Sequence, residues 1–223
     1  MEIKMGEKIL SKNDQIALEI TELFQKKKIL CINLMSSPGS GKTTLLEATI
    51  PELLEKDIRV GVLEGDVATQ LDAMRIEKFM IPVVQITTDC FGGSCHLSAS
   101  MIKDRIEELP LEDLDLIFIE NVGNLICPAG FKIGADKDVV VISLTEGQEK
   151  PLKYPAIFQR SHLALVNKID LADALGMDFH EVGDNIYRIN PKIQVEYLSA
   201  RTGEGVEQWI RWLKKEVRLK QAR

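Results

Sequence analysis

Residues 36–43 read Ser36-Ser37-Pro38-Gly39-Ser40-Gly41-Lys42-Thr43, and this stretch decides the fold of the 223-residue chain. It joins an apolar run at residues 28–35 to a helical pattern, which predicts a strand, a loop and a helix. In that context the pattern G-x-x-x-x-G-K-[S/T] wraps phosphates in backbone N–H groups, and its hydroxyl binds Mg²⁺. Ser36 replaces the first glycine, but the rest of the pattern is intact. We expect nucleotide phosphates to be bound by Gly39, Ser40, Gly41, Lys42, Thr43 and Thr44.

A second string, Asn167-Lys168-Ile169-Asp170, follows a predicted strand at residues 163–166 and is typical of a guanine reader. Asp170 would accept two hydrogen bonds from guanine, Asn167 would support the base and loop, and the stem of Lys168 would cover the ring. Adenine presents an acceptor in that place, so the site would reject it strongly. Ser199-Ala200 ends a later strand, and we expect the Ala200 N–H to donate to guanine O6. Together the two strings predict GTP.

Two carboxylates end predicted strands at the phosphate side of the sheet. Asp66 follows the strand at residues 59–64, and Glu120 ends the strand at residues 116–120. With Thr43 they are candidate Mg²⁺ ligands, and one of the two carboxylates would orient the attacking water while Lys42 assists catalysis. A strand-end carboxylate without such a role is the alternative for each.

Residues 120–123, Glu-Asn-Val-Gly, occupy the place of the D-x-x-G element of GTPases. The Gly123 N–H would sense the γ-phosphate, which makes residues 121–125 a candidate switch. No glutamine follows Gly123 to position water, so we expect slow intrinsic hydrolysis that needs a partner or a dimer.

The rest of the pattern alternates apolar strands with helices, which predicts a mostly parallel sheet covered on both faces. This is a three-layer α/β fold, and we expect one domain over residues 1–223, with an amphipathic helix at about residues 7–26 ahead of the first strand. Further helices are predicted near residues 43–56, 70–79 and 96–108. A last helix is predicted after the strand at residues 193–198, and shorter helical segments lie between these elements. Two long loops follow strand ends, at residues 87–94 and 121–137, where ligands bind in this architecture.

Composition narrows the functional classes. Hydrophobic residues make up 45% and charged residues 28%, which is ordinary for a globular protein, and the net charge of −6 argues against nucleic-acid binding. No apolar run is long enough to span a membrane, and the first eleven residues lack a secretory core. Four irregularly spaced cysteines do not make a disulfide framework. We expect a cytoplasmic protein whose thiolates are available to metals.

Three residues in the two long loops form a candidate metal site. Cys95 and His96 lie where the first loop meets a helix, and Cys127 lies in the second loop. Two thiolates and an imidazole suit Zn²⁺ or Ni²⁺, and the incomplete set would be extended in a symmetric dimer. Buried cysteines with no metal are the alternative. Cys31 is expected in the core, and Cys90 is either a spare ligand or a loop thiol.

The motifs together resemble the HypB family of SIMIBI-class P-loop GTPases. The resemblance covers nearly the whole chain, and its most specific string is Glu120-Asn121-Val122-Gly123-Asn124-Leu125-Ile126-Cys127-Pro128. It implies a GTP-hydrolysing metallochaperone that assists nickel insertion into [NiFe]-hydrogenases. Cys95, His96 and Cys127 would then form the family's nickel or zinc site at the interface of a GTP-promoted homodimer. The implied partners are a HypA-like nickel chaperone and the precursor of the hydrogenase large subunit.

One departure and several alternatives accompany this resemblance. The N-terminal segment has neither the Cys-x-x-Cys-type motif nor the histidine-rich tract of many family members, so we expect no separate nickel store. A UreG-like urease factor is the nearest alternative, although the UreG motif Cys-Pro-His reads Cys127-Pro128-Ala129 here. A non-enzymatic metal-binding module that senses GTP is another. A P-loop kinase would have no use for the guanine reader, and a targeting GTPase would need a second domain.

Overall fold

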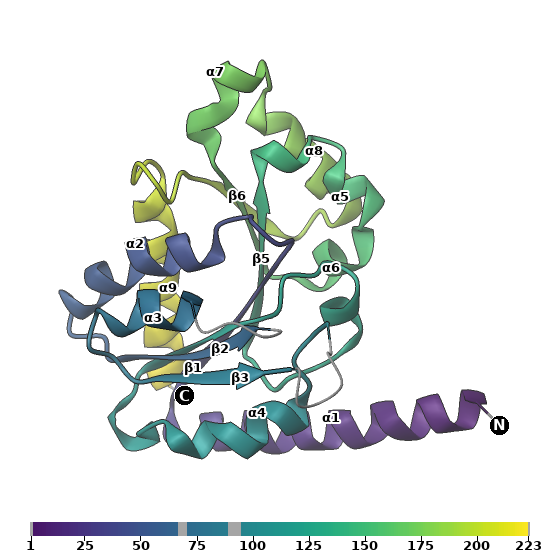
Figure 1. Cartoon of the computed structure of the whole chain (residues 1–223), viewed down its shortest axis with the longest axis vertical. Helices are drawn as coiled ribbons and strands as arrows, with labels where there is room; N and C mark the ends of the chain where they lie inside the picture. Colours follow the sequence, from purple (N-terminus) through teal and green to yellow (C-terminus); the bar gives the residue numbers. More distant parts are fainter. Residues whose placement is uncertain (1, 67–70, 89–94, 223) are drawn as a thin grey trace.

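The computed structural model describes residues 2–66, 71–88 and 95–222, and its centre is a sheet of seven parallel strands (Figure 1). The strands occur in the order β3-β2-β4-β1-β5-β6-β7, so the strand that leads into the phosphate loop, β1, lies between β4 and β5. Apolar residues fill these strands on both faces, as expected for a parallel sheet covered by helices. The strands are β1 Leu30–Ser36, β2 Val60–Asp66, β3 Val83–Thr87, β4 Leu116–Glu120, β5 Lys137–Ser143, β6 Leu163–Asn167 and β7 Gln194–Tyr197.

The connections between strands are helical, and several end in single 3₁₀ turns. The α-helices of the described residues are α1 Glu2–Lys27, α2 Lys42–Leu54, α3 Leu71–Glu77, α4 Ala99–Arg105, α5 Lys150–Lys153, α6 Pro155–Arg160, α7 Ala172–Leu175, α8 Phe179–Ile189 and α9 Val206–Gln221. The 3₁₀ turns are η2 Ile106–Glu108, η3 Leu111–Asp113, η4 Cys127–Gly130, η5 Leu144–Glu146 and η6 Ile169–Leu171.

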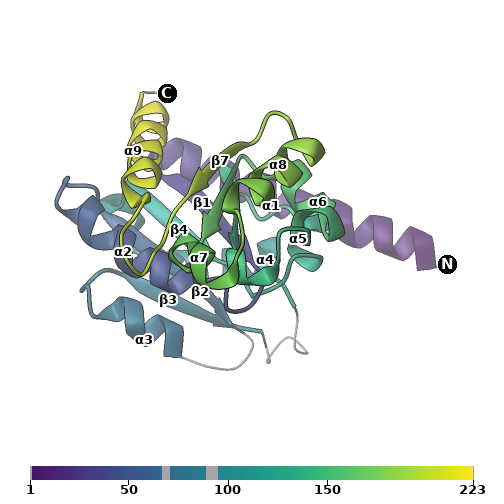
Figure 2. The ribbon, with the colours of Figure 1, turned by 90° about the horizontal axis from the view of Figure 1, so that it is seen from above.

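The helices divide between the two faces of the sheet (Figures 1 and 2). Helices α2, α3 and α9 cover one face, where they bury side chains of β1, β2 and β4. On the opposite face α1 and α4 pack against β1 to β4, while α6 and α8 pack against β5 to β7. The predicted three-layer α/β architecture is therefore confirmed. Cys31 of β1 lies in the core below α1, as predicted.

Two helices differ in extent from their predictions. The helix expected at about residues 7–26 spans Glu2–Lys27. The helix expected from His96 begins instead at Ala99, because the Ser98 side chain accepts a hydrogen bond from the Met101 N–H and caps the first turn. Gln70, at the expected start of α3, and Cys90 lie outside the described residues. None of the helices that the structure describes combines the length and the apolar character needed to cross a membrane.

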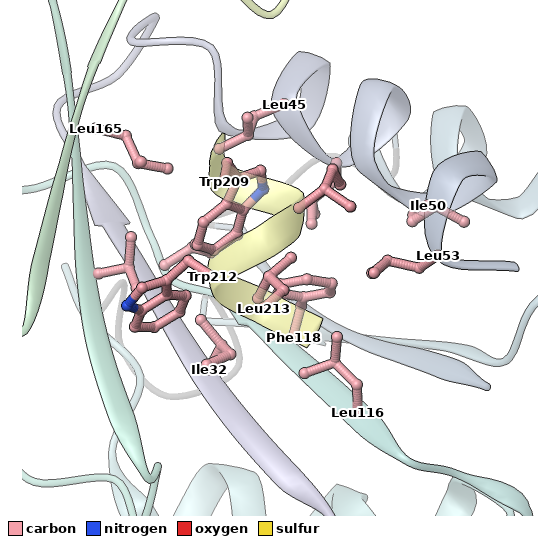
Figure 3. Close-up of a cluster of buried hydrophobic side chains, with 14 of the residues drawn as sticks. Ile32, Leu45, Ile50, Leu53, Leu116, Phe118, Leu165, Trp209, Trp212 and Leu213 are labelled. Carbon is pink, nitrogen blue, oxygen red and sulfur yellow. The ribbon is translucent and has the colours of Figure 1, made fainter. Parts of the chain in front are cut away.

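The core beneath α2 is organised around Trp209 of α9 (Figure 3). Its ring lies between α2 and the sheet with no exposed surface, and its Nε1–H donates to Thr49 Oγ1 of α2 at 2.9 Å. The Thr49 hydroxyl in turn donates to the Leu45 carbonyl at 2.6 Å. A single hydroxyl thus satisfies the only polar group of a large buried side chain, and it fixes α9 against the helix that begins at the phosphate loop.

Thr49→Val should lower the free energy of unfolding by about 1–3 kcal/mol, since the buried indole N–H would lose its acceptor without any change in volume. Thr49→Ser keeps the hydroxyl and loses one methyl group, so its loss should be about 1 kcal/mol. Urea unfolding followed by tryptophan fluorescence measures both variants. A Thr49→Val protein that is as stable as Thr49→Ser would contradict this account of the core.

Candidate functional site

The phosphate loop lies at the carboxyl end of β1, between Ser36 and the first turn of α2. Gly39 and Gly41 have φ angles of 75° and 97°, a region that favours glycine. Helix α2 begins after Gly41 without any side-chain cap, which leaves its positive end available for an anion. The buried Lys42 Nζ donates to Ser36 Oγ at 2.9 Å. Ser36, which replaces the first glycine of the pattern, is therefore the residue that holds the lysine.

A cavity of about 440 Å³ opens above this loop. It brings together most of the residues predicted for phosphate, magnesium and catalysis, and it adds residues of β2 and α3. Its lining consists of Pro38, Gly39, Gly41, Lys42, Thr43, Thr44, Glu64, Gly65, Asp66, Asp72, Arg75, Glu120, Asn121, Val122, Gly123 and Lys168. Ser40 lies beneath the loop, where its hydroxyl donates to Glu146 Oε1 at 2.7 Å.

Glu120 is the carboxylate held most closely to the loop. Thr43 Oγ1 donates to Glu120 Oε1 at 2.8 Å, while Oε2 is buried and has no hydrogen-bond partner among the described residues. Burial raises the pKa of Glu120, although the charge of Lys42 and the Thr43 hydrogen bond oppose this. Mg²⁺ prefers a hydroxyl and carboxylate oxygens of this kind, with nucleotide phosphates completing its shell. The donor set of Thr43 and Glu120 therefore fits the cation, and Asp66 lies at the edge of the same cavity.

Glu64 of β2 is a site residue that the motifs do not reveal. It is the register partner of Glu120 in the neighbouring strand, and it is only 2% exposed. Burial, and then the negative charge of Glu120, raise its pKa to about 8. The signal in the sequence is the alternation Val60, Val62, Glu64, which places an acidic residue on an otherwise apolar face of the strand.

The switch candidate begins directly after Glu120 and lies against the phosphate loop. A Cβ atom on Gly123 would lie 3.0 Å from the Pro38 backbone and ring, which is tighter than an ordinary contact, so glycine favours the close approach of the two loops.

The predicted guanine reader lines a neighbouring pocket of about 250 Å³, at whose mouth Asp170 is exposed. Asn167 Nδ2 donates to the Ser40 carbonyl at 2.8 Å, and Lys168 Nζ donates to the Gly39 carbonyl at 2.7 Å. These two hydrogen bonds fix the segment at residues 167–170 to the phosphate loop. The pocket is formed by Gly41, Thr44, Asn167, Lys168, Asp170, Leu171, Ala200 and Arg201.

Ala200 lies in this pocket, and its N–H donates to Asn167 Oδ1 at 3.0 Å. Its contact with guanine O6 stays a prediction. Ser199 Oγ accepts from the Thr202 N–H at 3.1 Å. Through these two hydrogen bonds, Ala200 holds Asn167 and Ser199 holds the turn that follows, and both residues thereby shape the pocket.

The three predicted metal ligands come together at the protein surface, near the face of β4 that is covered by α1 and α4. Potential ligand atoms of Cys95, His96 and Cys127 all lie within 4.8 Å of one another. The His96 ring stacks on Phe131 with a centroid distance of 4.0 Å, and burial lowers its pKa, which favours the neutral ligand form. A hydrogen bond that the Cys127 thiol donates to the neighbouring Cys95, and then burial, raise the pKa of Cys127. Two thiols and an imidazole at this spacing can bind a soft or borderline divalent metal.

A buried polar network on the face of the sheet covered by α1 and α4 begins beside this cluster. Asn121 is 1% exposed, and its Oδ1 accepts from the Leu97 N–H at 3.1 Å, next to His96. Its Nδ2 donates to Asn33 Oδ1 at 3.1 Å, and Asn33 Nδ2 donates to Asp138 Oδ1 at 2.7 Å. Asn121 follows Glu120 in the chain, so one strand end contacts both sites.

The network continues to the second half of the metal cluster. Arg160 forms an ion pair with Asp138 at 2.8 Å, and its Nη1 donates to the carbonyls of Pro128, Ala129 and Phe131 at 2.8 to 3.0 Å. These carbonyls lie directly after Cys127. The segments that carry His96 and Cys127 are therefore held by the two ends of one hydrogen-bonded chain, which motif spacing does not predict.

Comparison with known proteins agrees with this geometry. Residues 30–196 match the model of the CobW/HypB/UreG nucleotide-binding domain. The hydrogenase maturation factor HypB of Escherichia coli K12 is 45% identical over 205 residues, which are 92% of this chain and 69% of that protein.

Two solved structures resemble the whole fold. HypB of Helicobacter pylori in complex with nickel has a TM-score of 0.87 at 36% identity and covers 94% of this chain and 97% of its own. HypB of Archaeoglobus fulgidus has a TM-score of 0.86 at 36% identity, over 93% of this chain and 100% of its own. The relatives are named HypB, so the UreG-like alternative is not favoured. The chain belongs to the CobW/HypB/UreG family of nucleotide-binding proteins and, within it, to the HypB hydrogenase maturation factors.

Proposed function

We propose that this protein is a GTP-hydrolysing metallochaperone that assists nickel insertion into [NiFe]-hydrogenase during maturation. One observation carries the proposal: consecutive residues of a single strand end, Glu120 and Asn121, contact the phosphate loop and the metal-ligand segment respectively. The names of its relatives and the nickel complex of one of them support the same function.

Phosphate chemistry follows from the groups around the cavity. Lys42 Nζ, which donates to Ser36 Oγ, would turn to the β- and γ-phosphate oxygens, which are stronger acceptors. Thr43 and Glu120 would hold Mg²⁺, which neutralises charge on the phosphates when bound. Asp66 or Glu120 would orient the attacking water. Gly123 lies against Pro38 of the phosphate loop, and its N–H would sense the γ-phosphate.

Specificity for guanine would come from Asp170 at the mouth of the smaller pocket. Its carboxylate accepts hydrogen bonds and donates none, which suits the N1–H and amino group of guanine. Asn167 and Lys168 form the floor and one wall, since both are fixed to carbonyls of the phosphate loop.

The nickel cargo, or Zn²⁺ in its place, would be bound by Cys95, His96 and Cys127. Three protein ligands leave the coordination shell incomplete, and a second copy of the chain would complete a shared site. We propose that GTP promotes this homodimer, and that the metal comes from a HypA-like nickel chaperone and goes to the hydrogenase large subunit precursor. A module that only senses GTP would show the same binding without turnover.

Lys42→Ala should reduce GTP hydrolysis about 10²-fold or more, because the positive charge that stabilises the transferring phosphate is lost. Phosphate release under single-turnover conditions measures the effect, with circular dichroism as the check on folding. Lys56→Ala removes an exposed lysine beyond the end of α2 and should hydrolyse GTP like the unmodified protein. Equal rates in the two variants would count against the phosphate loop as the reaction site.

Asp170→Asn should weaken GTP binding by about 10²-fold and improve xanthosine triphosphate binding, since the new amide meets the donors of guanine but matches the xanthine carbonyl. Competition against a fluorescent nucleotide gives both affinities. Asp173→Asn, an exposed change on α7, is the matched control and should leave the preference unaltered. Unchanged guanine preference in Asp170→Asn would remove this residue from the base site.

Cys95→Ala and Cys127→Ala should each abolish as much nickel or zinc binding as the double variant, because either change destroys the geometry of one shared site. Binding is measured with no nucleotide, with GDP and with a non-hydrolysable GTP analogue, and the mass in solution is recorded in each state. We expect metal affinity and dimer formation to change together with the nucleotide.

The control for these variants is Cys31→Ala, which removes a thiol buried in the core and should keep the metal. Additive losses in the two single variants would mean two independent sites. Metal binding that ignores the nucleotide would refute the metallochaperone function.

A further inference from the structure

Glu64 is a buried acid for which the packing of the fold gives no reason. Its neighbours on the same face of β2, Val60 and Val62, belong to the apolar core beneath α2, and an apolar residue would extend that core. Its carboxylate makes no hydrogen bond with the described residues, and Oε2 is shielded from solvent without a partner. A buried carboxylate left unpaired is costly, and no group among the described residues compensates this one.

The surroundings of Glu64 identify the charge of that group. Glu120, Asp66 and Asp72 all act on it with negative charge, and Lys42 is the cation that opposes them. Lys42 itself is directed to Ser36 and, under the proposed function, to the nucleotide phosphates. The remaining requirement is a positive charge between the two strands, where Glu64 and Glu120 stand side by side in register.

The two carboxylates also have matching free oxygens. Oε2 of Glu64 and Oε2 of Glu120 are both buried without hydrogen-bond partners in the described structure, and both side chains line the cavity above the phosphate loop. Glu64 is 2% exposed and Glu120 is 3% exposed. Oxygen ligands in a carboxylate pair beside nucleotide phosphates are the environment in which Mg²⁺ is bound.

We propose that Glu64 is a second carboxylate of the magnesium site, which together with Glu120 holds the cation that accompanies the nucleotide. This inference rests on the proposed function, since it requires a nucleotide in the cavity. It assigns a role to a residue outside both the P-loop and the switch string. Glu64 would therefore attract the phosphates through the cation, and it would not attract them when the cation is absent.

This dependence on the cation gives a test that a purely structural residue would fail. Binding of fluorescent GDP is measured with saturating MgCl₂ and with EDTA for the unmodified protein, Glu64→Gln and the control Glu55→Gln, an exposed carboxylate beyond the end of α2. We expect Glu64→Gln to bind GDP about tenfold more weakly in Mg²⁺ and equally or more tightly in EDTA. The Mg²⁺ concentration for half-maximal GDP retention should rise about tenfold. Titration of free Mn²⁺ by electron paramagnetic resonance should show the same loss directly.

The outcomes separate this inference from the proposed function. If Glu64→Gln weakens GDP binding equally in Mg²⁺ and in EDTA, Glu64 has a structural role only. If GDP binding changes in neither condition, Glu64 has no role in nucleotide binding. Either result overturns the proposal. Failure of the unmodified protein to bind GDP in a Mg²⁺-dependent way would instead refute the nucleotide site itself. If Glu64→Gln folds poorly by circular dichroism, Glu64→Met, which suits the apolar face of β2, replaces it in the same comparison.

Discussion

The structure depends on where β4 ends, at the centre of the sheet between β1 and β2. Side chains of a strand alternate between its faces, so Leu116, Phe118 and Glu120 face α2 whereas Ile117, Ile119 and Asn121 face α1 and α4. The last residue on the first face reaches Thr43 of the phosphate loop, and the first residue beyond the strand on the other face reaches Leu97 beside the metal cluster. Because side chains alternate along β4, the adjacent residues Glu120 and Asn121 lie at two different sites.

The same constraint accounts for the distribution of polar groups in an otherwise apolar interior. Glu64, Glu120, Asn33 and Asn121 are buried at positions where the core would accept aliphatic side chains, and they are placed where strands end or cross toward a ligand site. Asn33 and Asn121 are hydrogen-bonded to one another, whereas each glutamate has one oxygen without a partner among the described residues. Violations of core patterning that remain unsatisfied within the chain are typical of functional sites. The asparagine pair joins β1 to the end of β4, and the glutamate pair lines the cavity above the phosphate loop.

Features that are encoded in a few contiguous residues could be predicted from the sequence, whereas features that depend on distant segments lying side by side could not. The phosphate loop, the strand positions and the guanine string are encoded in contiguous residues, and the structure places Lys42, Thr43 and Asn167 around the expected cavities. The pairing of Glu64 with Glu120 depends on β2 lying beside β4, an adjacency that no short string contains. The same is true of Arg160, whose contacts with carbonyls after Cys127 join segments about thirty residues apart, and of Asn167, which accepts a hydrogen bond from the Ala200 N–H.

The polar chain from Leu97 through Asn121, Asn33 and Asp138 to Arg160 limits how the two sites can behave. Asn121 is adjacent in sequence to Glu120 and buried, so a shift of the strand end toward a bound phosphate must carry its amide or break its hydrogen bonds. Each of those bonds leaves a buried polar group unsatisfied when broken, at a cost of about 1–3 kcal/mol. Moving the segment of His96 along with the strand end avoids that cost. The phosphate loop and the segment of His96 are thus joined through two adjacent residues at the end of β4.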